Sequence, residues 1–161
     1  MTRTSTGLQR GTAAQSSENQ QRLYQQLLTC MRGSWHSLVV IPAEPGISVY
    51  DIADALVEVS SLVRGTTAAL FNAEGQGINA ASKIIVDMVS HVDADGLAVV
   101  AIDSVVDKQA GVPIVMAADA ALLCVHLGRT QTFNAQKTIE IVGAEKFIGA
   151  LTIEKDPRRR S

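Results

Sequence analysis

Short apolar runs alternate with amphipathic stretches along most of the chain. Five runs rich in Val, Ile, Leu and Ala lie at residues 38–41, 68–71, 97–102, 120–127 and 147–153. Continuous apolar runs of this length are typical of strands that are buried on both faces of a parallel sheet. The pattern predicts an α/β fold: a single doubly wound, mainly parallel sheet of five strands or slightly more, with helices on both faces.

Helical periodicity fills the intervals between the apolar runs. Leu23, Leu27 and Met31 recur every four residues and predict an opening helix that begins near Ser17 and ends by Gly33. Further helix patterns cover residues 48–64, 78–88 and 132–142. Gly65 stands where the first of these three helices needs a C-cap.

The length of 161 residues suits one domain. Residues 1–16 are rich in Thr, Ser, Gly and Gln and have little to bury, so they are predicted to be a flexible tail. Residues 17–153 form the predicted domain, and residues 154–161 form a short basic tail that ends in three arginines before Ser161.

Composition narrows the possible partners and the compartment. The formal net charge of -2 gives no field that would attract nucleic acid, so we expect no nucleic-acid partner. Cys30 and Cys124 each lie in an apolar pattern, which predicts neither a disulfide framework nor a metal site. We see no signal peptide and no apolar stretch long enough to span a membrane, and therefore expect a cytoplasmic protein.

The first loop of the predicted sheet departs from a nucleotide-binding sequence. In a doubly wound sheet, ligands bind in the loops after the carboxyl ends of strands, here the loops that begin at Pro42, Asn72 and Asp103. A P-loop reads GxxxxGK[ST], because backbone N–H groups cradle phosphates, the Lys reaches the outer phosphates and the hydroxyl binds magnesium. The first loop here reads LVVIPAEPGISVYDIADAL.

This segment resembles the first strand and deviant Walker loop of bacterial tyrosine kinases of exopolysaccharide synthesis and of the related MinD and ParA ATPases. Pro45 and Gly46 match the Pro-Gly-x-Gly-Lys-Ser/Thr pattern of that family. Ser48 stands in place of the second Gly, Val49 in place of the Lys, and Tyr50 in place of the magnesium-binding hydroxyl. The resemblance therefore implies a degenerate nucleotide loop, P-loop NTPase-like in fold but without its catalytic residues.

Two features of the loop residues also disfavour phosphoryl transfer and triphosphate binding. Phosphoryl transfer depends on positioning and on electrostatic stabilisation of phosphate charge, and Val49 supplies no charge. Glu44 and Asp51 add negative charge on either side of the loop. Ser48, three residues before Asp51, has a simpler interpretation as the N-cap of the following helix, although a helix N-terminus can still hold an anion weakly.

The second half of the chain resembles the same kinases. Asp103 matches their Walker B aspartate, and residues 128–130 match the Gly-x-Thr turn before the last helix. Asn72 stands where the family has a second magnesium-binding aspartate, and the C-terminal tyrosine cluster has no counterpart, since the only tyrosines are Tyr24 and Tyr50. The resemblance runs from about residue 18 to residue 153.

Several alternatives stay open. Gly75, Gly77 and Ala80 form a GxGxxA sequence that could bind a dinucleotide, but the adjacent Glu74 would repel pyrophosphate, so a loop followed by a helix start is the simpler interpretation. Asp103 could bind a metal or cap its own loop. The three histidines (His36, His91 and His126) are too far apart in the pattern to form a metal site.

Our sequence-based hypothesis is a non-catalytic pseudo-ATPase or pseudokinase with a regulatory or scaffolding role. The resemblance implies a setting in bacterial exopolysaccharide synthesis or export, and a partner that is a polysaccharide co-polymerase or a kinase-like protein. We expect no cofactor, no metal and no catalytic residue, self-association into a homo-oligomer, and contact with the inner membrane only through a protein partner. The alternatives are a nucleotide-dependent switch or enzyme that retains weak ATP or NAD binding, and a MinD-like regulator of positioning.

Overall fold

The computed structural model describes residue 18 and residues 20–154. Its core is a five-stranded sheet with the order β2-β3-β1-β4-β5, in which every pairing is parallel. The strands are β1 (Ser37–Pro42), β2 (Ala68–Asn72), β3 (Leu97–Ala101), β4 (Ala120–His126) and β5 (Phe147–Ile153). The predicted doubly wound α/β class is therefore confirmed, and the sheet is wholly parallel.

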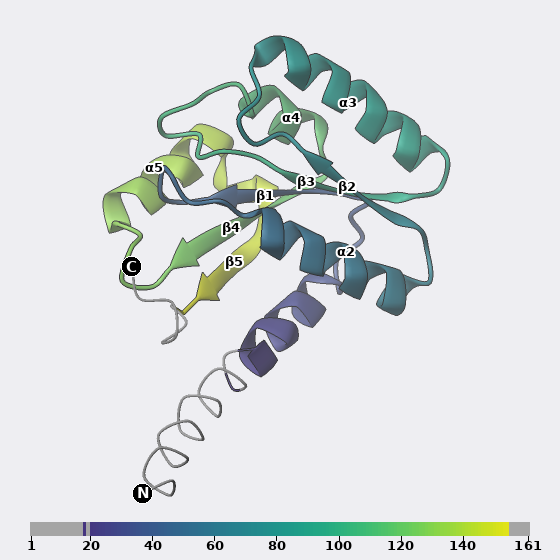
Figure 1. The fold of residues 1–161 in the computed structure, drawn as a ribbon, viewed down its shortest axis with the longest axis horizontal. Helices are drawn as coiled ribbons and strands as arrows, with labels where there is room; N and C mark the ends of the chain where they lie inside the picture. Colours follow the sequence, from purple (N-terminus) through teal and green to yellow (C-terminus); the bar gives the residue numbers. More distant parts are fainter. Residues whose placement is uncertain (1–17, 19, 155–161) are drawn as a thin grey trace, which may run out of the picture.

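Helices cover both faces of the sheet (Figure 1). A helix over residues 20–30, called here the first helix, lies with α2 (Tyr50–Arg64) on one face. The other face carries α3 (Ile78–Asp93), α4 (Val112–Ala117) and α5 (Thr132–Val142), and the short 3-10 helix η1 (Ala144–Lys146) leads into β5. The chain moves across the sheet in one direction from β1 to β2 and then returns in the other direction through β3, β4 and β5. Because crossovers between parallel strands are right-handed, α2 lies on one face and α3, α4 and α5 lie on the other.

Two hydrophobic clusters, one on each face, hold these layers together. Val40, Leu56 and Leu122 belong to the cluster beneath the first helix and α2. Val100 and Ile114 belong to the cluster beneath α3, α4 and α5. All residues of β1 and β3 are buried, which agrees with their continuous apolar sequences.

The predicted element bounds are mostly correct. The helix at 132–142 and the strand at 147–153 match residue for residue, and Gly65 is the left-handed C-cap of α2 with φ 62°. Helix α2 begins at Tyr50, two residues later than predicted. Helix α4 was not among the helices predicted from periodicity, because its six residues, VPIVMA, are too few to display a helical repeat.

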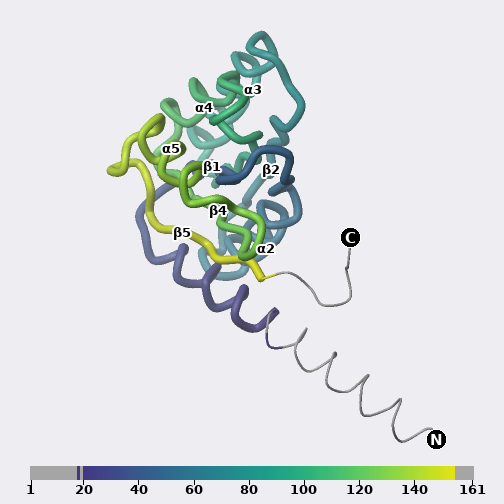
Figure 2. The backbone as a smooth tube through the Cα atoms, turned by 90° about the vertical axis from the view of Figure 1, so that its left-hand side faces the viewer, coloured from purple at the N-terminus to yellow at the C-terminus, as the bar shows by residue number. Residues whose placement is uncertain are grey.

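The first helix covers the β5 edge of the sheet (Figure 2). The side-chain amide of Gln26 accepts a hydrogen bond from the Thr152 N–H at 2.9 Å and donates one to the Thr152 carbonyl at 3.2 Å. Arg22 forms an ion pair with Glu154 at the same end. One amide side chain thus supplies the pair of bonds that a neighbouring strand would make, and it protects this edge.

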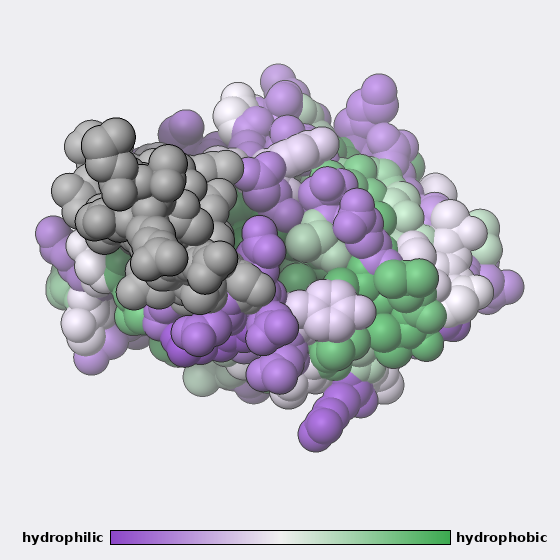
Figure 3. Space-filling view, turned by 60° about the horizontal axis from the view of Figure 1, so that its bottom comes forward, coloured by the Kyte–Doolittle hydropathy of each residue, from purple (hydrophilic) through white to green (hydrophobic). Residues whose placement is uncertain are grey.

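Hydrophobic side chains also lie exposed on the lower face of the molecule, where the first helix and α2 are found (Figure 3). Leu62 is 76% exposed and Val63 51% exposed, both in the last turn of α2. Among the helices of the described residues, none is long and apolar enough to cross a membrane. The bounds of the two predicted tails, 1–16 and 154–161, lie outside the described residues except for Glu154.

Candidate functional site at the carboxyl ends of the strands

Because all five strands are parallel, the four loops that follow β1 to β4 lie at one edge of the sheet. We call this edge the carboxyl face, defined as residues 43–51, 72–78, 102–111 and 126–134. Strand β1 lies between β3 and β4, and its following helix goes to the opposite face from theirs. The loop after β1 therefore opens at the topological switch point, where doubly wound proteins bind their ligands.

A carboxylate of the chain occupies the start of α2. Glu74, in the loop after β2, accepts a hydrogen bond from the Val49 N–H at 2.9 Å through Oε2 and one from the Ser48 hydroxyl at 2.8 Å through Oε1. The Ser48 hydroxyl oxygen in turn accepts a bond from the Tyr50 N–H at 3.2 Å. A P-loop presents these groups at the start of its helix to a phosphate, whereas here they bind the chain's own anion.

A second carboxylate binds the start of α5 in the same way. Oε2 of Glu44 accepts hydrogen bonds from the Gln131 N–H at 3.0 Å and from the Asn134 side-chain amide at 2.8 Å. These bonds lower the pKa of the Glu44 carboxyl below its usual value, and the bond from Asn134 is the largest cause. The loop after β1 is thus tied to the loop after β2 by Glu74 and to α5 by Glu44.

Asp103 serves as a loop cap. Its Oδ2 accepts a hydrogen bond from the Gly75 N–H at 2.7 Å and lies 3.6 Å from the ammonium of Lys108. Asn72 Oδ1 accepts a bond from the Glu74 N–H at 3.0 Å. The hydrogen bond of Asp103 goes to the loop after β2, whereas one of the two open roles had it cap the loop that follows Asp103; only the contact with Lys108 lies within its own loop.

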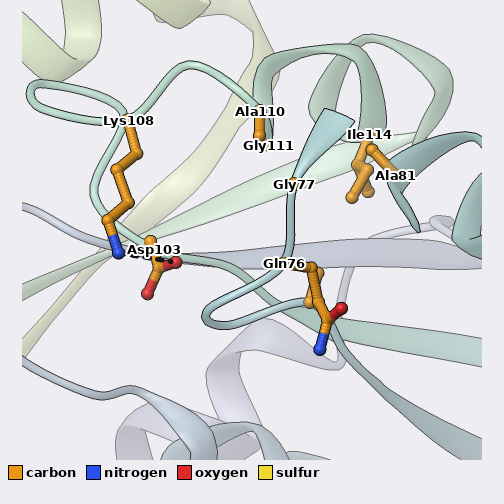
Figure 4. A pocket seen from close by; sticks show the side chains of 9 residues that line it. Gln76, Gly77, Ala81, Asp103, Lys108, Ala110, Gly111 and Ile114 are labelled. Carbon is orange, nitrogen blue, oxygen red and sulfur yellow. Dashed lines mark ion pairs between the residues drawn. The ribbon is translucent and has the colours of Figure 1, made fainter. Parts of the chain in front are cut away.

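The cavity at this face is small. It lies between the loops after β2 and β3, with Gln76, Asp103 and Lys108 among its lining residues (Figure 4). Its volume of about 10 Å³ is roughly that of a single water-sized sphere. Pockets for small-molecule ligands measure about 300–1,000 Å³. This cavity is therefore too small to hold a nucleotide.

The residues of the predicted degenerate loop take up structural positions. Pro45 precedes Gly46, which turns the chain with φ 82°. Val49 is fully buried in the core and is the N-cap residue of α2. The prediction that Ser48 is the N-cap is wrong, since it lies one residue before the N-cap residue Val49. Helix α2 starts later than predicted, and the Glu74 carboxylate supplies the capping acceptor.

The remaining candidate groups are the possible metal ligands and the histidines. No group of three or more His, Cys, Asp or Glu side chains suited to a metal occurs within residues 18 and 20–154. His126 ends β4, where burial and the nearby Arg129 lower its pKa, and its buried Nδ1 has no hydrogen-bond partner in the described structure. His91 lies at the opposite edge of the sheet, where its ring is edge-on to Phe71 and its Nε2 lies 3.3 Å from the Thr67 carbonyl oxygen.

A wider surface depression of about 520 Å³ lies at the opposite edge of the sheet, lined in part by His36, Arg64 and Asp95. The Arg64 guanidinium there donates hydrogen bonds to the carbonyls of Met31, Gly33 and Trp35. Three of its five N–H donors are therefore used by the chain itself.

Sequence reasoning identified Glu44 and Glu74 only as charges that would repel phosphate. Their role as caps for helices in other parts of the chain depends on loop positions that no local pattern encodes. The available signal was the absence of good capping side chains at Val49 and Gln131, which leaves the starts of α2 and α5 in need of an acceptor from elsewhere. Comparisons with protein-family models, curated proteins and solved structures found no match to this chain.

Proposed function

We propose that this protein is a non-catalytic pseudo-ATPase that acts as a regulatory or scaffolding partner of other proteins. The observation that carries the proposal is the hydrogen bond from the Val49 N–H to the Glu74 carboxylate at the start of α2. A nucleotide phosphate bound there would have to displace this carboxylate and then lie beside its negative charge. Neither the lysine nor the magnesium-binding hydroxyl of a P-loop is present to compensate.

The electrostatics of the carboxyl face favour the same role. Glu44, Glu74 and Asp103 all direct carboxylate oxygens at backbone N–H groups of neighbouring loops. Those N–H groups are the donors that an anion-binding loop would offer to a ligand. Since the protein satisfies them internally, its fold does not depend on a bound nucleotide, and the surface is available for protein contacts.

The biological setting that we propose follows from the resemblance to bacterial tyrosine kinases. It is exopolysaccharide synthesis or export at the inner membrane, reached through a polysaccharide co-polymerase or a kinase-like protein. We also propose that the chain forms a homo-oligomer, since helix 20–30 resembles the helix through which those kinases pack into rings. Deletion of the gene in its host should change the yield or length of an exported polysaccharide, and an unchanged polymer would exclude this setting.

Ligand binding tests the biochemical part. Thermal unfolding of the purified protein should show no shift in Tm with magnesium and millimolar ATP, ADP, GTP or NAD. A ligand present at 100 times its Kd stabilises a protein by about 2.7 kcal/mol, which such an experiment detects easily. Glu74→Gln, which keeps the shape of the side chain and removes its charge, should be compared with Glu58→Gln on the exposed side of α2. Stabilisation of the wild type by any of these ligands would contradict the proposal and favour the nucleotide-dependent switch, and phosphate release from ATP or GTP in addition would favour an enzyme.

A further inference from the structure

Four large apolar side chains project into solvent around the carboxyl face. They are Tyr50 at the start of α2, Ile78 at the start of α3, Leu127 after β4, and Phe133 at the start of α5. Their exposed fractions are 40%, 58%, 46% and 69% in the same order. Four different loops and helix starts thus place exposed apolar groups around one edge, and aromatic residues such as Tyr50 and Phe133 are enriched at protein–protein interfaces relative to the rest of the surface.

The charge of this face is one-sided. Its acidic residues are Glu44, Asp51, Glu74, Asp103 and Asp107. Its basic residues are Lys108 and Arg129, so the formal charge is 2 − 5 = −3 with His126 neutral. The other described residues have 6 basic and 10 acidic side chains, a formal charge of −4 spread over the rest of the fold. The carboxyl face therefore carries −3 of the −7 of the described part of the chain, and its charged groups are mostly acidic.

The net negative charge of the face decides between possible occupants. A second copy docked through the same face would bring −3 against −3, and like charges brought together across an interface oppose association. A nucleotide or another polyanion is disfavoured for the same reason. A surface that carries cationic side chains between apolar ones would complement both the acidic residues and the apolar rim.

We propose that the carboxyl face is a docking surface for a basic, amphipathic segment of a partner protein, with Phe133, Tyr50 and Ile78 as its apolar anchors. The inference rests on the proposed function, because it assigns the protein contact to the face that a nucleotide would otherwise occupy. Glu44 and Glu74 keep this face in a fixed shape before the partner arrives, since their bonds connect the loop after β1 to its neighbours on both sides. A preformed surface lowers the ordering cost of binding.

The test uses a fluorescent 14-residue peptide of alternating Lys and Leu blocks with helical spacing, titrated with the whole protein and followed by anisotropy. Binding to the wild type should be detectable below ~100 µM, and the double variant Phe133→Ser with Ile78→Ser should weaken it at least ~10-fold. The matched control is Leu62→Ser with Val86→Ser, two positions that are 76% and 62% exposed but lie outside the carboxyl face. This control should bind like the wild type.

The contribution of charge to peptide binding is tested with separate variants. Asp107→Lys, at an exposed position, changes the charge of the face from −3 to −1 and should weaken binding, whereas Glu58→Lys on α2 should not. A peptide with Glu in place of Lys, and one with Ser in place of Leu, should both bind poorly. Circular dichroism would establish that each variant is folded as the wild type is.

Several results would overturn the docking proposal: no binding to the wild type, equal losses in the control variants, or equal binding of the acidic peptide. A dimer in light scattering that Phe133→Ser with Ile78→Ser converts to a monomer would show that a second copy is the occupant instead. The test of the docking surface and the test of the pseudo-ATPase assignment can fail independently of each other. Magnesium-ATP binding would contradict the pseudo-ATPase assignment even if the peptide binds, and failure of the peptide alone would leave that assignment intact.

Discussion

Glu74 and Val49 lie 25 positions apart in the sequence, yet Oε2 of the Glu74 carboxylate accepts the Val49 N–H at 2.9 Å. The bond joins the loop after β2 to the first turn of α2. Val49 itself is fully buried and has no polar side chain to cap the helix that follows it. The carboxylate from the neighbouring loop therefore provides both the hydrogen-bond acceptor and the favourable charge at the positive end of the helix dipole.

Loss of this carboxylate should destabilise the protein. Glu74→Ala removes an N-terminal cap and should lower the free energy of unfolding by about 0.5–2 kcal/mol. Glu74→Gln keeps an acceptor oxygen and should cost less. Urea unfolding at neutral pH measures both, with Glu58→Ala as the control on an exposed position of α2. If all three variants unfold at the same urea concentration, the Glu74 cap contributes no stability.

Glu44 should make stability depend on acid. Its pKa is lowered in the folded protein by the Asn134 amide and the Gln131 N–H, so the folded state binds fewer protons than the unfolded state as the pH falls. The stabilisation is therefore complete above the ordinary pKa of a glutamate and is lost as the pH falls through the lower, folded-state pKa.

Asn134→Ala removes the largest cause of this shift. The variant should be less stable than the wild type at pH 7, and the difference should shrink as the pH is lowered below about 4, the usual range of a glutamate. Urea midpoints measured from pH 7 to pH 3 would show this, and Glu44→Gln, which cannot titrate, serves as the reference. A difference that stays constant with pH would show that Asn134 acts without the charge of Glu44.

Arg64 should be among the most important side chains for stability. Its guanidinium lies 4.4 Å from the centre of the Trp35 ring and donates hydrogen bonds to three carbonyls at the end of the first helix and in the turn after it, one of them Met31 at 3.2 Å. Arg64→Ala leaves these half-buried carbonyls without partners and should cost about 2–4 kcal/mol. Arg64→Lys should recover only part of the lost stability, because an ammonium group lacks the planar fork of N–H donors that the guanidinium has.

Thermal and urea unfolding of the Arg64 variants, followed by the fluorescence of Trp35, would measure this effect. Trp35 is the single tryptophan of the chain, so its emission reports on this contact directly. Arg32→Ala, at an exposed position near the end of the first helix, is the control. A loss in Arg32→Ala as large as in Arg64→Ala would point to a general charge effect.

Gln26 should protect the β5 edge from association. Gln26→Ala leaves the N–H and carbonyl of Thr152 without their side-chain partner and should lower stability by about 1 kcal/mol. An open strand edge also pairs readily with other chains. Light scattering should therefore show more aggregation on heating for Gln26→Ala than for Gln25→Ala on the exposed face of the same helix. Equal behaviour of the two variants would show that the edge is protected by other means.

The sequence determined the fold class for a simple physical reason. A strand buried on both faces needs a continuous apolar sequence, and an amphipathic helix needs a three-to-four residue repeat, so Val39, Val99 and Leu122 mark strands as clearly as Leu56 and Met88 mark helices. The same patterns gave the bounds of α5 and β5. They could not give α4, which is too short for a repeat, or the start of α2, where the capping group comes from another loop.

The sequence by itself also established that the loop after the first strand lacks a GxxxxGK[ST] sequence, because identity at a position needs no structure. Only the tertiary structure decided which group binds the start of α2. The strand order β2-β3-β1-β4-β5 brings the loops after β2 and β4 to either side of the loop after β1, and so directs Glu74 and Glu44 into contacts that link different loops. Pairings between residues 25 or 87 positions apart depend on how the crossovers fold back across the sheet, and no local pattern of residues encodes that distance.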